Sequence, residues 1–113
     1  MTDCIFCKII DGEIPSKKIY EDELIYAFED INAQAPVHFL VIPKKHIKSI
    51  DDIDTEDENL IGKIFTKIKE IAKAEGLDNG YRVVINCKDD GGQTVDHLHF
   101  HILGGRSLNW PPG

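Results

Sequence analysis

Apolar positions along this chain recur with two different periods, which predicts both helix and strand. The clearest helical period runs from about Glu56 to Glu75, where the i, i+3, i+4, i+7 spacing predicts one amphipathic helix. Its apolar positions are Ile61, Ile64, Phe65, Ile68, Ile71 and Ala72. Thr55–Glu58 has the form of a capping box and Gly76 suits the C′ position, so both helix ends are marked. We expect the acidic run Asp51–Glu58 to be a solvated helix start that the helix dipole favours.

Shorter apolar segments, separated by polar or glycine-containing turns, predict strands. They are Ile19–Tyr20, Leu24–Glu29, Phe39–Ile42, Tyr81–Asn86 and His97–Leu103. Pro43 is expected to stop the third, because proline cannot donate to a strand ladder. Ile5–Ile10 is expected to form a short helix or turn. Together these elements predict a single α+β domain over residues 1–113, with a mostly antiparallel five-stranded sheet, one main helix and a short N-terminal helix.

Charge and the length of the apolar runs limit the classes of partner. The formal net charge is −7 at pH 7, which disfavours nucleic acid, because affinity for its backbone comes from clustered lysine and arginine. A small phosphorylated ligand held by local donors is compatible with this charge. No apolar run approaches the ~20 residues of a membrane span, and the start Met1–Cys4 lacks the features of a signal peptide. We therefore expect a cytoplasmic protein with no membrane or nucleic-acid partner.

Three histidines, His97, His99 and His101, fall in one predicted strand. The strand period of two places their imidazoles on one face, about 6.6 Å apart, and the apolar residues between them on the other. Three imidazoles and a water can hold a catalytic zinc. Alternatively, one neutral imidazole can attack phosphorus and form a covalent intermediate that water later hydrolyses. That route needs a ring held in one tautomer, for example by a carbonyl that accepts from its other nitrogen. The spacing alone does not choose between the two.

The segment Gly91-Gly92-Gln93-Thr94 comes shortly before these histidines, in the predicted loop Lys88–Thr94. Glycine lets backbone amides approach a phosphate where side chains would block them. The hydroxyl of Thr94 could donate to a leaving-group atom. An ordinary tight turn is the alternative reading of the glycine pair.

Cys4 and Cys7 form a C-x2-C half-site. Structural zinc is nearly always four-coordinate, so two more ligands would have to come from elsewhere, and histidine is the natural supplier. Buried structural cysteines fit the same spacing. Cys87 is expected to be a core residue at the end of a strand. An odd count of three cysteines does not build the disulfide framework of a small secreted protein, which favours a metal site in a reducing compartment.

The motif Gly91–Leu103 resembles the His-φ-His-φ-His-φ-φ signature of the histidine triad (HIT) superfamily. The resemblance extends through Leu103–Gly113 and the earlier stretch Pro36–His46, and it is to the nucleotide-binding Hint branch. It implies the HIT fold and a homodimer whose subunits join their sheets. It also implies a purine nucleotide pocket and hydrolysis of nucleoside phosphoramidates and aminoacyl adenylates, with release of AMP or GMP.

The same resemblance implies roles for individual residues. His99 matches the nucleophile, His101 would contact the phosphate, His38 would support the histidine network, and Thr94 would lie near the leaving nitrogen. The implied nucleotide-binding residues are Ile14, Phe28, Asp30, Ile31, Asn86, Gly92, Gln93, Thr94, His99 and His101. Asp30 would accept from the ribose hydroxyls, although on its residues alone it is equally a turn residue before Asn32.

The opening C-x2-C resembles that of bacterial HIT proteins that bind zinc. The implied ligands are Cys4, Cys7, His46 and His97. A zinc closed by four protein ligands is structural and would leave His99 free as the nucleophile. Asp96 departs from the family, because this position is often uncharged in relatives, which affects fine specificity rather than chemistry. Two other functions stay open: a nucleotide-binding regulatory or scaffolding module with incidental turnover, and a metal-dependent hydrolase.

Overall fold

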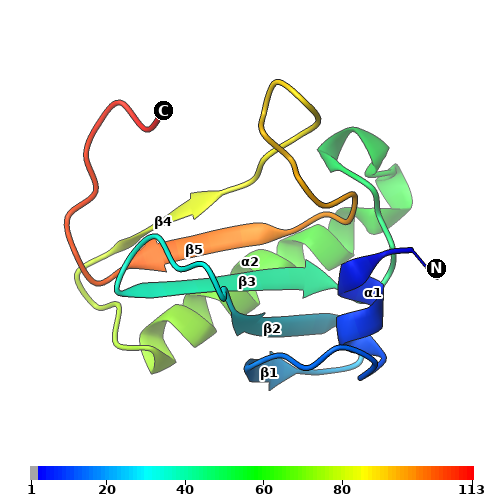
Figure 1. Cartoon of the computed structure of the whole chain (residues 1–113), viewed down its shortest axis with the longest axis horizontal. Helices are drawn as coiled ribbons and strands as arrows, with labels where there is room; N and C mark the ends of the chain where they lie inside the picture. Colours follow the sequence, from blue (N-terminus) through cyan, green and yellow to red (C-terminus); the bar gives the residue numbers. More distant parts are fainter. Residues whose placement is uncertain (1–2) are drawn as a thin grey trace.

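The computed structural model describes residues 3–113 and shows one antiparallel sheet with a long helix on one face and a short helix on the other (Figure 1). The sheet order is β1-β2-β3-β5-β4. The strands are β1 (Lys18–Glu21), β2 (Ile25–Glu29), β3 (Val37–Pro43), β4 (Tyr81–Val84) and β5 (Phe100–Gly104), and the helices are α1 (Ile5–Ile10) and α2 (Glu58–Ala74). The predicted α+β class and five-stranded antiparallel sheet are confirmed.

Helix α2 forms where the apolar period predicts it and covers one face of the sheet. It begins two residues later than expected, because Thr55–Asp57 form a 3-10 turn. The cap also differs from the prediction: the Asp57 carboxylate accepts from the Asp54 N–H at 3.0 Å. Gly76 follows the helix with φ +80°, a left-handed conformation that suits glycine. Within residues 3–113, no helix is both long and apolar enough to cross a membrane.

The two faces of the sheet carry different layers, which follow from the strand period of two. On β3, Phe39 and Val41 pack in the core beneath α2, whereas Leu40 and Ile42 pack with α1. The α1 layer is small: its buried helical residues are Phe6 and Ile9. The chemistry-bearing histidines lie on this second, thinly covered face.

Strand β5 is shorter than predicted. Its ladder with β3 begins at the pair Val41 and Phe100, so His97–His99 come before it. The expected alternation nevertheless continues, because Leu98 is buried in the same core as Phe100 and Ile102. The side chains alternate here without strand pairing because Leu98 is buried and its N–H donates to the Ile47 carbonyl at 2.7 Å. Strand β4 likewise ends at Val84 rather than at residue 86.

Two further expectations are corrected. The acidic helix start is not wholly solvated, because Asp57 is only 3% exposed and its carboxylate accepts from the Lys45 ammonium. That pair ties the loop after β3 to the beginning of α2. Cys87 is half-buried in the loop after β4 and is not part of the core. The strand ends three residues before it, which removes the reason for expecting it there.

Candidate functional site

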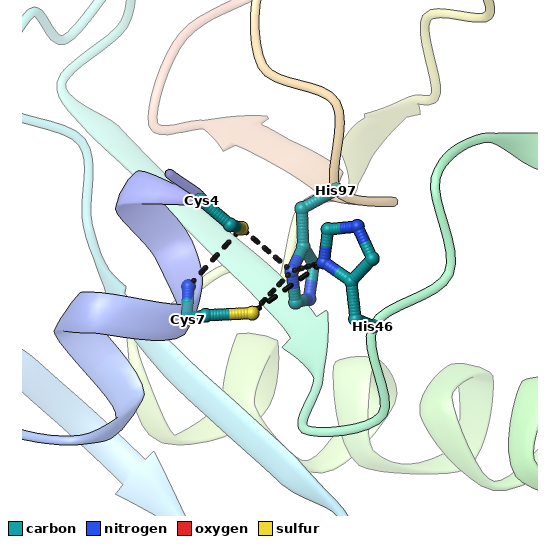
Figure 2. A group of neighbouring side chains, drawn as sticks. All are labelled: Cys4, Cys7, His46 and His97. Carbon is teal, nitrogen blue, oxygen red and sulfur yellow. Dashed lines mark hydrogen bonds between the residues drawn. The ribbon is translucent and has the colours of Figure 1, made fainter. Parts of the chain in front are cut away.

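Four sulfur and nitrogen atoms from three segments meet beside α1 (Figure 2). Cys4 and Cys7 come from the start of α1, His46 from the loop after β3, and His97 from the segment before β5. The His97 Nδ1 lies 3.3 Å from Cys4 Sγ, 3.6 Å from Cys7 Sγ and 3.2 Å from His46 Nδ1. Cys7 Sγ is 3.4 Å from His46 Nδ1. The structure thus brings together all four residues that the resemblance implies as ligands.

Backbone groups orient this cluster. The His97 Nε2 is 2.8 Å from the Pro43 carbonyl, which can only accept, so Nε2 carries the proton. The single lone pair on His97 Nδ1 then faces three close neighbours at once. The Cys7 N–H donates to Cys4 Sγ at 3.3 Å. Burial, and after it the Cys4 thiol, raise the pKa of the Cys7 thiol to about 11, so a bound cation would have to drive its deprotonation.

The spacing of these atoms can be compared with a tetrahedral zinc site. Zinc lies about 2.3 Å from sulfur and about 2.0–2.1 Å from nitrogen, so tetrahedral geometry puts a sulfur and a nitrogen about 3.5 Å apart and two nitrogens about 3.3–3.4 Å apart. The measured sulfur–nitrogen distances are 3.3, 3.4 and 3.6 Å, and the nitrogen–nitrogen distance is 3.2 Å. The spacing of the four residues therefore fits a metal ion coordinated tetrahedrally by four protein ligands.

His99 lies on the same face of the sheet, next to this cluster. Its Nδ1 is 2.7 Å from the carbonyl oxygen of His97. The carbonyl accepts, so a neutral His99 carries its proton on Nδ1 and has a free lone pair on Nε2. Its ring packs nearly perpendicular to the Phe6 ring, with the two centroids 5.1 Å apart, and its centroid lies 5.0 Å from that of the His101 ring. The arrangement meets the requirement for a nucleophilic imidazole, which is one fixed tautomer.

A second pair of histidines follows the same logic. The Gln34 N–H donates to His38 Nδ1 at 3.0 Å, so the His38 proton is on Nε2. That Nε2 is 3.0 Å from His101 Nδ1 and donates to it. A neutral His101 then carries its own proton on Nε2, where it is available to an anionic ligand. His38 thus connects the Gln34 backbone to the His101 ring.

Burial keeps these imidazoles neutral. It lowers the pKa of His38 and of His99 below the usual histidine range. Burial, and after it the neighbouring His99 and His38, lower the pKa of His101 to about 4. Asp30 opposes the shift, since its carboxylate is 3.4 Å from His38 Nε2 and 3.9 Å from His101 Nδ1. At neutral pH the site therefore presents uncharged rings in fixed tautomers.

Only some of the residues expected to contact the nucleoside lie together in the structure. Phe28 and Ile14 belong to the apolar cluster on the α1 face. Asp30 Oδ1 accepts from the Asn32 N–H at 2.8 Å, the turn expected as its alternative role, while Oδ2 faces His38. Ile31 is fully exposed.

The loop that contains Gly91 and Gly92 is held by hydrogen bonds between its own backbone groups. The N–H groups of Gly92 and Gln93 donate at 3.0 Å to the carbonyls of Asp89 and Lys88. The carboxamide of Gln93 donates to the carbonyls of Lys48 and Val95 and accepts from the Lys88 N–H. Closing this turn therefore occupies the N–H groups of Gly92 and Gln93, which were among the donors expected to face a phosphate. Asn86 is half-buried between β4 and this loop.

The hydroxyl-bearing Thr94 is exposed and lines a hollow of about 500 Å³ that it shares with Cys4 and His46. Asp96 lines the same hollow. Thr94 thus faces open space next to the cluster of Cys4, Cys7, His46 and His97.

Comparison with known proteins identifies the family. The family model for the HIT domain matches residues 11–108. The chain belongs to the HIT family. It is 55% identical over 111 residues to an uncharacterized HIT-like protein of Synechococcus elongatus, covering 98% of this chain and 97% of that one.

Solved structures agree with this assignment. A HIT family hydrolase from Legionella pneumophila matches with a TM-score of 0.96 and 52% identity, over 98% of this chain and all of that one. A histidine triad nucleotide-binding protein from Candida albicans matches with a TM-score of 0.83 and 37% identity, over 96% of this chain and 83% of that one.

Within this HIT domain the three triad histidines do not converge on one point. The His97 ring joins the cysteines and His46, whereas the His101 ring joins His38 and Asp30. This division favours the nucleophilic reading over a zinc held by all three. Sequence reasoning missed the backbone groups of Gln34 and Pro43, which set the tautomers. No side-chain pattern marks them, since any residue supplies an N–H or a carbonyl in the right place.

Proposed function

We propose that this HIT protein is a purine nucleotide-binding hydrolase of the Hint branch. It cleaves nucleoside 5′-phosphoramidates or related nucleotidyl derivatives, such as aminoacyl adenylates, and releases AMP or GMP. The observation that carries the proposal is the 2.7 Å bond between His99 Nδ1 and the His97 carbonyl, because it frees Nε2 as a nucleophile in a buried, neutral ring. The names of the Legionella hydrolase and the Candida nucleotide-binding protein support it.

For a phosphoramidate substrate, the reaction has two steps. In the first, the Nε2 lone pair of His99 forms a bond to phosphorus while the bond from phosphorus to the leaving nitrogen breaks, and that nitrogen keeps the electron pair and takes up a proton. In the second, water attacks phosphorus, the bond to Nε2 breaks, and water gives up a proton. One water is consumed, and one amine and one nucleoside monophosphate leave.

Neighbouring side chains would bind the nucleotide. The Nε2–H of His101 donates to a phosphate oxygen, a role that the His38 and Gln34 bonds prepare. The hydroxyl of Thr94 lies near the leaving nitrogen. Asn86 would lie at the phosphate end. Gly92 and Gln93 would act there by shaping the loop, because their N–H groups and the Gln93 carboxamide are bonded within it or to neighbouring carbonyls.

The nucleoside would occupy the α1 face of the sheet. Phe28, Ile14 and Ile31 flank the purine, and full exposure of Ile31 leaves its side chain available for such a contact. The Asp30 carboxylate accepts from the two ribose hydroxyls, which are donors that suit it.

The test is the turnover of His99→Ala with adenosine 5′-phosphoramidate. We expect kcat to fall by at least about 10³-fold, since removal of a nucleophile abolishes the covalent route. Affinity for AMP, measured by calorimetry, should change little. Full turnover by His99→Ala would contradict the proposal. Failure of the folded wild type to bind AMP would also contradict it. AMP binding by a wild type that shows no turnover would favour the regulatory module.

We further propose that Cys4, Cys7, His46 and His97 hold a structural zinc. When bound, the ion supplies a cross-link between α1, the loop after β3 and the segment before β5, and it performs no chemical step. Elemental analysis of reduced, purified protein should give one zinc per chain in the wild type and in Cys87→Ser, but not in Cys7→Ser. Wild-type protein free of zinc, or zinc retained by Cys7→Ser, would refute this assignment.

The proposed assembly is a homodimer that joins two sheets. Strand β4 lies at one edge of the sheet, so its outer backbone groups are available for pairing, and its Tyr81 is 39% exposed. Sedimentation should give twice the mass of one chain, and a single-chain mass at micromolar concentration would reject the dimer. A cytoplasmic location suits the three free thiols.

A further inference from the structure

One peptide group lies between the cysteine–histidine cluster and the nucleophile. It joins His97 to Leu98. Its carbonyl oxygen accepts from His99 Nδ1 at 2.7 Å, and its N–H donates to the carbonyl of Ile47 at 2.7 Å. The peptide bond is planar, so the direction of the N–H fixes the direction of the carbonyl. Whatever holds this peptide therefore aims the ring of His99.

Both anchors of this peptide adjoin a proposed metal ligand. Ile47 directly follows His46, and the peptide begins at His97 itself. The sheet does not hold it, because the ladder between β3 and β5 starts only at the pair Val41 and Phe100. The peptide is thus held by the Ile47 bond, by the buried Leu98 side chain and by the His97 ring in the cluster.

The cluster reaches the nucleophile by a second path. Phe6 lies between the two cysteines in α1 and is 7% exposed. Its ring stands at 85° to the His99 ring with centroids 5.1 Å apart, and it also contacts the His97 ring at 6.0 Å. Fixing Cys4 and Cys7 therefore fixes the wall against which His99 rests.

We propose that the Cys4, Cys7, His46 and His97 cluster, with its metal bound, positions the nucleophile by clamping the peptide between His97 and Leu98. His97 is then a positioning residue with two functions: its ring is a ligand, and its carbonyl selects the Nδ1–H tautomer of His99. The inference rests on the proposed function, in which His99 attacks through Nε2. It makes the metal more than a cross-link, because the metal's loss acts on the reacting ring.

The test compares Cys7→Ser, which removes a ligand, with the matched control Cys87→Ser, which removes the thiol outside the cluster. Nitrogen-15 NMR of the imidazoles reports which His99 nitrogen carries the proton, and it does not depend on turnover. We expect wild type and Cys87→Ser to show the Nδ1–H tautomer with zinc bound. In Cys7→Ser we expect a mixture of tautomers and a fall in kcat of about 10- to 100-fold, with AMP affinity changed by less than about threefold.

A second measurement covers the case in which Cys7→Ser does not fold. The zinc of the wild type is removed with a chelator and then restored, and the same His99 signals are followed. Return of the Nδ1–H tautomer with zinc supports the inference. A metal-free protein that keeps both the Nδ1–H tautomer and its kcat overturns it. That result leaves the proposed function standing if His99→Ala is inactive, so failure of the two ideas is distinguishable.

Discussion

At the scale of single residues, backbone carbonyls and amides decide where the protons lie. His97, His99 and His38 each have one ring nitrogen fixed by a backbone group. The three resulting tautomers have different consequences. His97 directs Nδ1 to the cysteines, His99 keeps a lone pair on Nε2, and His38 donates a hydrogen bond to His101. Identical side chains thus acquire different chemistry from their backbone partners.

The depressed pKa of His101 predicts how stability depends on pH. The unfolded chain protonates this ring near pH 6.5, whereas burial and its neighbours His99 and His38 lower its pKa in the folded chain to about 4, against the opposing Asp30. Between those values the unfolded state binds more protons, so the free energy of unfolding should fall as pH is lowered from 6.5 toward 4.

The measurement is denaturant unfolding at several pH values. His101→Gln is the comparison, because it keeps a polar group but cannot titrate. Its stability should fall less than that of the wild type over the same range. Equal losses in the two proteins would show that His101 is not responsible.

At the scale of elements, close packing distinguishes a glycine in the loop after β4 from a glycine in α2. A Cβ at Gly91 would lie 2.5 Å from the carbonyl oxygen and 2.7 Å from the amide nitrogen of Cys87, whereas a Cβ at Gly62 in α2 would meet nothing within 4 Å. The loop therefore depends on glycine at Gly91, and the helix does not depend on it at Gly62.

These two positions give opposite predictions for substitution by alanine. Gly62→Ala should raise the free energy of unfolding by about 0.5–1 kcal/mol, because alanine is the better helix former. Gly91→Ala should lower it by about 1–3 kcal/mol through steric strain and should reduce kcat/KM by displacing Thr94. Both are checked by urea unfolding and steady-state kinetics. Stabilisation by Gly91→Ala would contradict the packing described for the loop.

How well each element could be predicted depends on whether its signal is local. Helix α2 was predicted because its apolar stripe repeats over many residues. Its exact start was not, because the 3-10 turn depends on Asp57 being drawn into contact with Lys45, twelve residues earlier. The start of β5 was predicted too early, since alternation shows which way side chains face and not where the ladder begins.

At the scale of the whole molecule, the sheet places the main apolar core on one face and the candidate functional residues on the other. The α2 face holds the larger apolar core, and the α1 face holds the histidines and cysteines. The motif was sufficient to predict the family and the four clustered ligand candidates. It could not reveal that the N–H groups of Gly92 and Gln93 are occupied within their loop, because such contacts depend on the path of the folded backbone.

The central claim is that His99 forms a bond to phosphorus. The most direct measurement is rapid-quench mass spectrometry of the protein after brief mixing with adenosine 5′-phosphoramidate, comparing wild type, His99→Ala and a zinc-chelated sample. We predict an acid-labile adenylyl adduct on His99 in the wild type and no adduct in His99→Ala. Full turnover with no adduct on His99, stopping at once on chelation, would contradict the claim and favour a metal-dependent hydrolase.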